Sequence, residues 1–442
     1  MKRVRGVADL PQGSRRTVLE ALARLDRDGV TAQAALDAAL GASSPDPRRR
    51  RQTAELFYGY LREQIRCAHL VRRHLRRPET LPPLLLRLLE LGVYTLRRQD
   101  GVPAYAAVHE TVEDCRRLFG KGLAGLGNAV LRSVQRLGDA VEDVAYYREG
   151  GADEELALAL RHSLPRDVVT LWRKAYGEAD ALALMERSQA RPWRGVRLNP
   201  LHPGHEELRR ALVEAGGVPC GFTGLAFAPG TFPDEASGRG TRELESAGAL
   251  SFQAAGSQQV LRELHRMAPV AGPVWDGCAG RGGKALCLSE QGVAVPWCSD
   301  VSPGRMEALP ARCRVLGLEA PRLFLADMAR PPFGRGAMDI LLDVPCTGLG
   351  VLSRRPDLRR RFRGESVERM ALLQRAMLEA CLRRLAPGRR CWYVTCTLDP
   401  VENGGVVRGA LGAVPGCELV GEWTTPHGHR WMEGMYGAAI RR

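Results

Sequence analysis

Apolar residues recur three and four positions apart throughout the first third of the chain. This spacing places them on one face of a helix, and residues such as Gly29, Pro78 and Gly120 separate the segments. The alternation that is typical of strands is missing from this pattern. It predicts an all-helical domain over residues 1–140, packed as a bundle. The expected helices are 15–25, 32–40, 49–75, 82–96, 104–119 and 125–137.

The middle of the chain has a mixed pattern. Residues 154–159 and 167–188 have helical spacing, whereas residues 195–201 are typical of a strand. Residues 230–248 are rich in turn-forming residues, and we expect a linker or mobile loop there. These features predict a small mixed α/β linking domain over residues 141–245.

The last part of the chain alternates between short apolar strands and helices. Such alternation predicts an α/β fold, with a parallel sheet covered by helices on both faces, over residues 246–442. Ligands bind such sheets beyond the carboxyl ends of the strands. The expected strands are 273–276, 294–299, 322–325, 338–342 and 391–395, and the expected helices are 284–291, 304–316 and 366–385.

Composition and charge favour a polyanionic partner. The chain has 442 residues, too many for one ordinary domain, and a formal net charge of +14. Most basic residues are arginine, whose planar guanidinium donates two parallel hydrogen bonds to phosphate. A genome biased towards arginine explains the ratio of arginine to lysine, but not the excess of positive charge. The charge therefore favours nucleic-acid binding.

Other classes of protein fit poorly. The first residues contain no apolar segment of a signal peptide, and no apolar run reaches the roughly 18 residues of a membrane helix. The 12 cysteines include no CxxC pair, which argues against zinc fingers and disulfide frameworks. We expect a cytoplasmic monomer that holds no metal and does not bind membranes. Most of its cysteines are expected to be reduced and buried.

A glycine-rich turn follows the first strand of the α/β region. In "VWDGCAGRGGKALCL", residues 274–288, the strand ends in Asp276 and four glycines lead into a helix. Glycines let the backbone approach a ligand, and the helix start offers free N–H groups to an anion. Asp300 ends the next strand, where an acidic residue binds ribose hydroxyls. The segment indicates a nucleotide-type cofactor site; the alternative is a plain tight turn.

Two further aspartates close later strands. Asp327 follows the third strand, where its carboxylate could accept a hydrogen bond from the amino group of an adenine. The alternative for Asp327 is a helix or turn cap. Asp343 ends the fourth strand, "MDILLD".

Two cysteines follow strands at the same predicted edge. Cys346 stands in "DVPCTGLG", residues 343–350, and Cys396 ends the strand of "CWYVTCTLDPVEN", residues 391–403. If the two strands are parallel neighbours, both thiols lie beside the cofactor loop. Each cysteine alone is at least as well explained as core packing, and Cys391 keeps that interpretation.

A pair of cysteines suits methyl transfer to a pyrimidine. The C5 carbon becomes nucleophilic only when a thiolate adds to C6; a base then removes the C5 proton and the thiolate leaves. The attacking cysteine must be deprotonated. A protonated Asp343, which burial could favour, could hydrogen-bond the base as charge develops. A base inside folded RNA must first be unstacked.

These motifs resemble those of the bacterial RNA (cytosine-5)-methyltransferases of the NOL/NOP/Sun family. The family's cofactor loop resembles "DGCAGRGGK", residues 276–284, and its cysteine motifs resemble "DVPCTGLG" and "YVTCTLDPVEN". Its L-N-P strand and Q-x-x-x-S-Q segment are similar to residues 198–200 and 253–258. The helical part, with "GLGNAVLRSVQR", is similar to the NusB-like RNA-binding domain of the subgroup that modifies small-subunit ribosomal RNA. The resemblance covers almost the whole chain.

The resemblance implies a Rossmann-like class I methyltransferase domain that uses S-adenosyl-L-methionine and makes 5-methylcytosine in 16S ribosomal RNA. It implies that Cys396 is the nucleophile, that Cys346 assists product release, and that Asp343 belongs to the catalytic set. The residues expected to line the cofactor site are Cys278, Ala279, Gly280, Arg281, Gly282, Gly283, Lys284, Asp300, Asp327 and Asp343.

The chain departs from the family pattern at two places. The family loop reads Ala-Ala-Pro-Gly-Gly-Lys, and here Arg281 replaces the rigid proline, so we expect a more flexible loop with altered cofactor affinity. Met435 and Tyr436 stand where the family has paired aromatic residues. Two other functions fit the sequence: methylation of transfer RNA, and a non-catalytic role as a ribosomal RNA-binding assembly factor.

Overall fold

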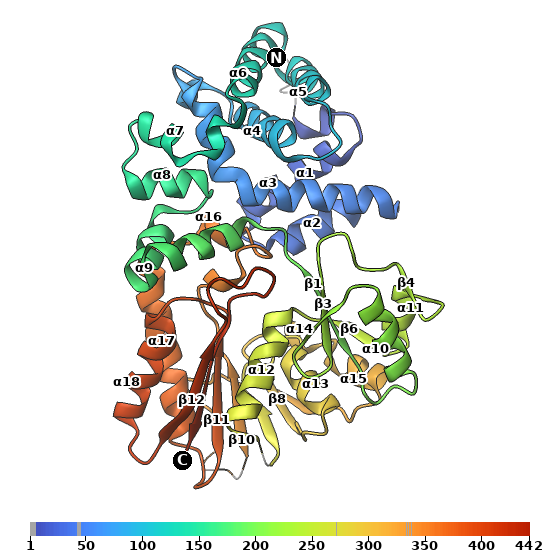
Figure 1. The fold of residues 1–442 in the computed structure, drawn as a ribbon, viewed down its shortest axis with the longest axis vertical. Coiled ribbons are helices and arrows are strands. Elements are labelled where there is room, and N and C mark those ends of the chain that lie inside the picture. The colour runs from blue at the N-terminus through green and yellow to red at the C-terminus, as the bar shows by residue number, and fades with distance from the viewer. Residues whose placement is uncertain (1–5, 42–45, 271, 333, 335, 337) are drawn as a thin grey trace. The chain divides into compact units, whose positions relative to one another are not determined.

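Two bodies share the chain, one helical and one built on sheets (Figure 1). The computed structural model describes residues 6–41, 46–270, 272–332, 334, 336 and 338–442. The helical unit comprises Met1–Arg173 and Leu352–Arg361. The sheet unit comprises Lys174–Val351 and Phe362–Arg442.

Amphipathic helices form the helical unit around one apolar core. Val18, Phe57, Leu88 and Leu131 are completely buried in this core. Within the described residues of the unit there is no strand, which confirms the prediction of an all-helical front. From its start to α8, the elements of the unit are η1 (Val7–Asp9), α1 (Ser14–Asp28), α2 (Ala32–Gly41), α3 (Pro47–Arg73), η2 (Pro78–Thr80), α4 (Pro83–Arg98), α5 (Ala104–Phe119), α6 (Lys121–Arg136), η3 (Gly138–Glu142), α7 (Val144–Glu149) and α8 (Glu154–Arg161).

A short segment from far along the sequence completes the helical unit. Arg359, in α16 (Leu358–Arg361), is buried, and its Nη1 donates to the carbonyl oxygens of Ser163 (2.7 Å) and Arg62 (2.9 Å). The chain therefore leaves the sheet unit after Val351 and returns to it at Phe362. Local sequence spacing could not indicate this packing, because Arg359 and Arg62 are 297 positions apart.

The sheet unit begins within α9 (Arg166–Gln189), which is interrupted by the non-helical Gly177 (φ 76°). A four-stranded antiparallel sheet follows, in the order β2-β3-β1-β6, and buries Val196 against α10 (His205–Glu214). Three of its strands lie within residues 141–245, and the fourth, β6, lies beyond them. Its strands are β1 (Arg194–Leu198), β2 (Val218–Cys220), β3 (Gly224–Phe227) and β6 (Leu250–Phe252).

The prediction of a linker or mobile loop over residues 230–248 is wrong. This stretch contains a small hairpin, β4 (Glu235–Ala236) and β5 (Arg239–Gly240), and then α11 (Thr241–Ser246). Ser237 and Gly238, at the hairpin turn, both have positive φ (49° and 69°). Such turns match the twist of paired strands, so turn-rich composition here marks a hairpin.

A seven-stranded sheet forms the larger part of the sheet unit, in the order β12-β13-β11-β10-β7-β8-β9. The five strands from β11 to β9 in this order are parallel, as predicted, whereas β12 and β13 add an antiparallel pair at one edge. The sheet is therefore mixed: the five predicted strands are parallel, and an antiparallel pair is added to them. The strands are β7 (Val274–Asp276), β8 (Trp297–Asp300), β9 (Arg322–Leu325), β10 (Asp339–Asp343), β11 (Arg390–Thr395), β12 (Glu418–Thr424) and β13 (Tyr436–Arg441).

Helices cover both faces of the large sheet (Figure 1). Successive residues of β11 show the two faces, because Trp392 packs with α12, α13 and α15 and Tyr393 packs with α17 and α18. From β7 the chain runs outwards through β8 and β9, and then returns to add β10 on the other side of β7. Ligands bind at such a switch point. The helices are α12 (Ala255–Met267), α13 (Gly283–Glu290), α14 (Pro303–Met306), α15 (Leu309–Leu316), α17 (Glu365–Leu382) and α18 (Val406–Ala413).

All 12 cysteines are free thiols in the structure. Within the described ranges, no helix is long and apolar enough to cross a membrane. The same part of the chain contains no group of three or more metal-ligating side chains that could hold an ion.

Candidate active site

The loop between β7 and α13 has the open backbone that the glycines predicted. Gly280 and Gly282 have positive φ (55° and 78°), which other residues rarely adopt. A Cβ at Gly282 would lie 2.2 Å from the Leu309 side chain, so this position also has no room for a larger residue. No side chain caps the start of α13. Its first N–H groups are thus available to an anionic ligand.

Asp300 is tied to this loop. Its Oδ2 accepts a hydrogen bond from the backbone N–H of Gly280 (3.0 Å), and its Oδ1 accepts one from Ser302 (2.9 Å). The structure therefore brings Asp300 to the glycine loop, as the sequence predicted. Asp327 lies in the turn after β9, is exposed, and accepts a hydrogen bond from the N–H of Ala329 (2.9 Å). In this structure Asp327 is a turn cap, the alternative considered from the sequence.

Charged groups meet where β7 and β10 end. Lys284 Nζ lies 2.5 Å from Oδ2 of Asp343. Asp343 is therefore paired with an ammonium group, and its side chain is about one-third exposed (32%). Asp276 is completely enclosed, and its burial, together with the nearby charge of Asp343, raises the pKa of its carboxyl to about 7.

The two predicted cysteines meet at the edge of the sheet. β10 and β11 are parallel neighbours, with Asp343 opposite Val394, so the chain beyond each strand emerges on the same side. Sγ of Cys346 lies 3.2 Å from Sγ of Cys396, and the backbone N–H of Cys396 donates to Sγ of Cys346 (3.3 Å). Both side chains are partly accessible. Cys391 is completely buried in the core, as expected.

The surroundings shift the pKa values of the two thiols in opposite directions. The hydrogen bond from Cys346 lowers the pKa of Cys396 against the effect of burial. The charges of Asp343 and Glu402 raise this pKa, and the charge of Lys284 lowers it. The same hydrogen bond, with burial, raises the pKa of Cys346. Of the two thiols, Cys396 is therefore the one that loses its proton more readily.

Gly350 joins the segment after Cys346 to the end of β11. Its N–H donates to the carbonyl of Cys396 (3.0 Å), and its own carbonyl accepts from the N–H of Gly434 (2.8 Å). A Cβ at Gly350 would lie 1.9 Å from the Gly434 oxygen, so no side chain fits.

We expect Gly350→Ala to destabilise the protein by about 1–3 kcal/mol, because overpacking forces the backbone apart at this point. Thermal denaturation measures the change. Gly412→Ala is the matched control, since Gly412 lies in α18, is exposed and has nothing within 4 Å of a new Cβ. Equal melting temperatures for Gly350→Ala and wild type would contradict the prediction.

Sequence reasoning missed two sets of buried polar residues around the site. Arg197 of β1 forms an ion pair with Glu290 at the end of α13, and donates to the carbonyl of Gly283 (3.0 Å). Glu402 and Gln374 hold the segment around Cys346. The charges of Arg197 and Glu402 beside apolar strands were the available signals: "GVRLNPL" and "DPVEN" each place a charge where the fold buries it.

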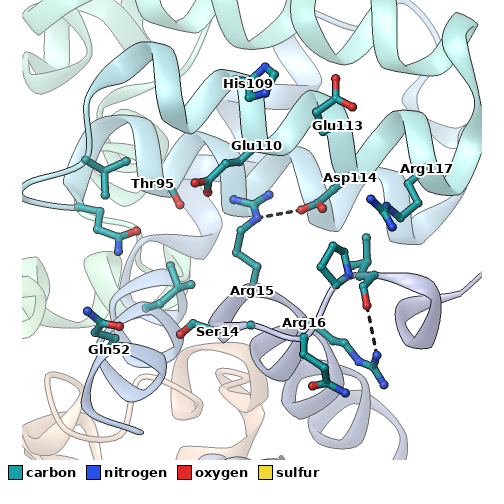
Figure 2. Close-up of a pocket in the computed structure, with 17 residues that line it drawn as sticks. Ser14, Arg15, Arg16, Gln52, Thr95, His109, Glu110, Glu113, Asp114 and Arg117 are labelled. Atoms are coloured by element: carbon teal, nitrogen blue, oxygen red, sulfur yellow. Dashed lines mark hydrogen bonds and ion pairs between the residues drawn. The ribbon is translucent and has the colours of Figure 1, made fainter. Parts of the chain in front are cut away.

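A separate cavity of about 610 Å³ lies within the helical unit (Figure 2). Arg15 points across it to Asp114, with Nε 2.9 Å from Oδ2. Arg16 pairs with Glu20 and also donates to backbone carbonyls. Both acidic and basic side chains line the wall, so the cavity does not have the uniform positive charge that a phosphate site needs.

Comparison with known proteins identifies both parts of the chain. Residues 12–136 match the model of the NusB family, and residues 267–436 match the model described as 16S rRNA methyltransferase RsmB/F. The ribosomal RNA small subunit methyltransferase B of Thermus thermophilus is 32% identical, over 95% of this chain and 96% of that protein. The protein of the same name from Vibrio cholerae is 31% identical, over 90% of each.

Solved structures share the fold. The crystal structure of PH0851 has a TM-score of 0.74 at 22% identity, over 98% of this chain and 99% of that one. NSun6 from Pyrococcus horikoshii, solved with SFG, has a TM-score of 0.52 at 20% identity, over 63% of this chain and 98% of that one. The predicted methyltransferase and NusB-like folds are thus confirmed. From the identity and coverage of these relatives, the chain belongs to the 16S rRNA methyltransferase RsmB/F family and is a methyltransferase with a NusB-family domain ahead of its catalytic domain.

Proposed function

We propose that this protein transfers a methyl group from S-adenosylmethionine to C5 of a cytosine in 16S ribosomal RNA, through a covalent bond between Cys396 and C6. The observation that carries the proposal is the contact of two thiols, 3.2 Å apart, at the carboxyl edge of adjacent parallel strands. Relatives named ribosomal RNA small subunit methyltransferase B support the choice of RNA.

The residues beyond β7, β8, β9 and β10 fit S-adenosylmethionine. The start of α13 is uncapped, and Gly280 leaves open space beside the backbone, so a ligand carboxylate can approach the N–H groups. The bound cofactor would supply an electrophilic methyl group. The residues that would hold it are Cys278, Ala279, Gly280, Arg281, Gly282, Gly283, Lys284, Asp300, Asp327 and Asp343.

Cys396 is the better nucleophile of the pair, because its hydrogen bond with Cys346 lowers its pKa. Its thiolate adds to C6 of the cytosine, and electrons of the C5–C6 double bond become available at C5. C5 would then take the methyl group, and the bond between the methyl carbon and the cofactor sulfur would break with its electrons going to sulfur. Lys284 and Asp343, paired at the same edge, could bind the polar groups of the base as charge develops.

Release reverses the covalent step. A base takes the proton from C5, the C5–C6 double bond forms again, and the bond between Sγ and C6 breaks with its electrons returning to sulfur. Cys346 is positioned to assist this step, because its sulfur touches the leaving thiolate. The structure thus supports a division of roles between the two cysteines, with one to attack and one to assist release.

The test is methyl transfer to defined RNA. The full-length protein is incubated with labelled S-adenosylmethionine and small-subunit ribosomal RNA from a strain that lacks the modification, and bisulfite sequencing locates 5-methylcytosine. We expect label at a cytosine of this RNA and none in RNA that is already modified. Label in transfer RNA alone would replace the proposed substrate, and no label in either RNA would favour a non-catalytic assembly factor.

A further inference from the structure

A buried glutamate lies behind the loop that carries Cys346. Glu402 belongs to η5 (Val401–Gly405), a π turn, and its side chain is completely buried. Its Oε2 accepts hydrogen bonds from the N–H of Thr347 (3.0 Å) and from Nε2 of Gln374 (2.8 Å), and its Oε1 accepts the Thr347 hydroxyl. Since Thr347 directly follows Cys346, this carboxylate holds the chain on one side of the cysteine.

Gln374 holds the chain on the other side. Its Nε2 also donates to the carbonyl of Pro345 (2.8 Å), the residue before Cys346. The hydroxyl of Tyr393 donates to the Glu402 carbonyl (2.7 Å) and lies 3.2 Å from Oε1 of Gln374. Gln374 and Tyr393 are completely buried. The backbone around Cys346 is therefore fixed by side chains that packing keeps in place.

The next residue, Asn403, holds the chain around Cys396. Its Oδ1 accepts the hydroxyl of Thr395 (2.6 Å), and its Nδ2 donates to the carbonyl of Thr397 (3.1 Å). The hydroxyls of Thr347 and Thr397 are 2.9 Å apart and join the two loops. One π turn thus holds both cysteine loops through adjacent residues.

Packing does not explain an acidic residue here. A buried carboxylate is unfavourable unless hydrogen bonds replace its water, and an apolar side chain would fill the same space. Burial raises the pKa of Glu402, and the hydrogen bonds from Thr347 and Gln374 oppose that rise. All three of these donors come from Thr347 and Gln374, the residues that determine where Cys346 stands.

We propose that Glu402 is a positioning residue that keeps the Cys346 thiol beside Sγ of Cys396, so that Cys346 donates its hydrogen to the Cys396 thiolate. The inference deepens the proposed function and rests on it for its purpose. Glu402 acts through Cys346 and need not touch RNA or cofactor.

The test measures Cys396 itself, without RNA or cofactor. The full-length protein is alkylated with iodoacetamide between pH 5 and 10, and mass spectrometry follows the peptide that contains Cys396. In Glu402→Ala the Cys346 thiol is free to move away, the Cys396 thiolate loses its hydrogen bond, and its alkylation profile shifts to higher pH. We expect alkylation at pH 7 to fall about tenfold, which corresponds to a rise of about one unit in pKa.

A conservative variant and a control variant separate the effect of the position of Cys346 from the effect of the charge of Glu402. Glu402→Gln can still accept from the Thr347 N–H and the Gln374 amide while its own amide donates to the Thr347 hydroxyl, so we expect a smaller shift than with alanine. Glu379→Gln, a surface carboxyl on α17 that pairs with Arg375 and Arg383, should leave the profile unchanged. If Glu402→Ala does not fold, Thr347→Val removes one donor at little change in shape and should shift the profile in the same direction. An unshifted profile in the folded variant would overturn the proposal.

A double-mutant comparison tests whether Glu402 acts through Cys346. In a Cys346→Ala background, Glu402→Ala should cause no further shift to higher pH, because the thiol it positions is already gone and the lost charge of Glu402 acts towards lower pH. An equal shift in both backgrounds would also overturn the proposal. This outcome is independent of methyl transfer: a wild type that transfers no methyl group but shows the coupled shift would reject the proposed function and keep the positioning role of Glu402.

Discussion

Cys396→Ala is expected to reduce methyl transfer by a factor on the order of 10³ or more, because no other group replaces a covalent nucleophile. Single-turnover transfer of label from S-adenosylmethionine to unmodified small-subunit RNA measures the loss. Cys346→Ala should still attack, although more slowly at neutral pH because Cys396 loses the hydrogen bond that lowers its pKa, and its release step should be slowed by more. A covalent protein–RNA adduct is therefore expected to accumulate, visible as a band of reduced mobility on a denaturing gel.

Cys391→Ala is the matched control for this pair. Cys391 lies in β11, the strand that Cys396 directly follows, but it is completely buried in the core that contains residues of α17 and α18. Cys391→Ala should leave both the rate of methyl transfer and the amount of covalent protein–RNA adduct near the wild-type level. An adduct with Cys396→Ala and none with Cys346→Ala would exchange the two roles.

The largest expected effect on stability belongs to Arg197. Its guanidinium forms a bidentate pair with Glu290, with Nε–Oε2 and Nη2–Oε1 distances of 2.5 and 2.9 Å, and both side chains are at most 2% exposed. Arg197→Met would leave the Glu290 charge buried without its partner, so we expect a loss of about 3–5 kcal/mol in the free energy of unfolding. Urea denaturation of the full-length protein, followed by circular dichroism, measures it.

Two further variants show whether the lost partner is the cause. Arg197→Met combined with Glu290→Leu removes both charges and should recover most of the stability. Arg375→Met breaks the exposed pair with Glu379 on α17 and should cost about 0–1 kcal/mol. A double variant as unstable as Arg197→Met would show that the loss of stability comes from the hydrogen bonds of Arg197 to the Gly283 carbonyl and to Oε1 of Gln253, and not from the ion pair.

Much of the fold could be predicted from local pattern. The all-helical front, the strands from β7 to β11 and the glycine loop lie where the sequence predicts them, because 3.6- and 2-residue periodicities and positive-φ glycines are local properties. The pattern failed over residues 230–248, since the same turn residues serve a loop or a tight hairpin. It also could not show the antiparallel pair at the edge of the large sheet.

For the candidate site, too, part could be predicted from the sequence and part depended on the tertiary structure. The sequence by itself indicated which residues are candidates for chemistry: the glycine loop, Asp300, and two cysteines that each follow an apolar strand. Only the tertiary structure decided which of them meet. It set β10 beside β11, which brings Cys346 and Cys396 into contact across 50 positions of sequence.

The sequence pattern could not predict the buried polar residues that support the site and the fold. Arg197 reaches Glu290 across 93 positions, Glu402 reaches Thr347 across 55, and Arg359 reaches Arg62 across 297. A buried charge is stable only beside partners that the fold supplies, and those partners leave no periodic trace in the sequence. The sequence therefore determined the elements and the reactive groups, whereas strand order and buried polar contacts, both products of long-range packing, decided their geometry.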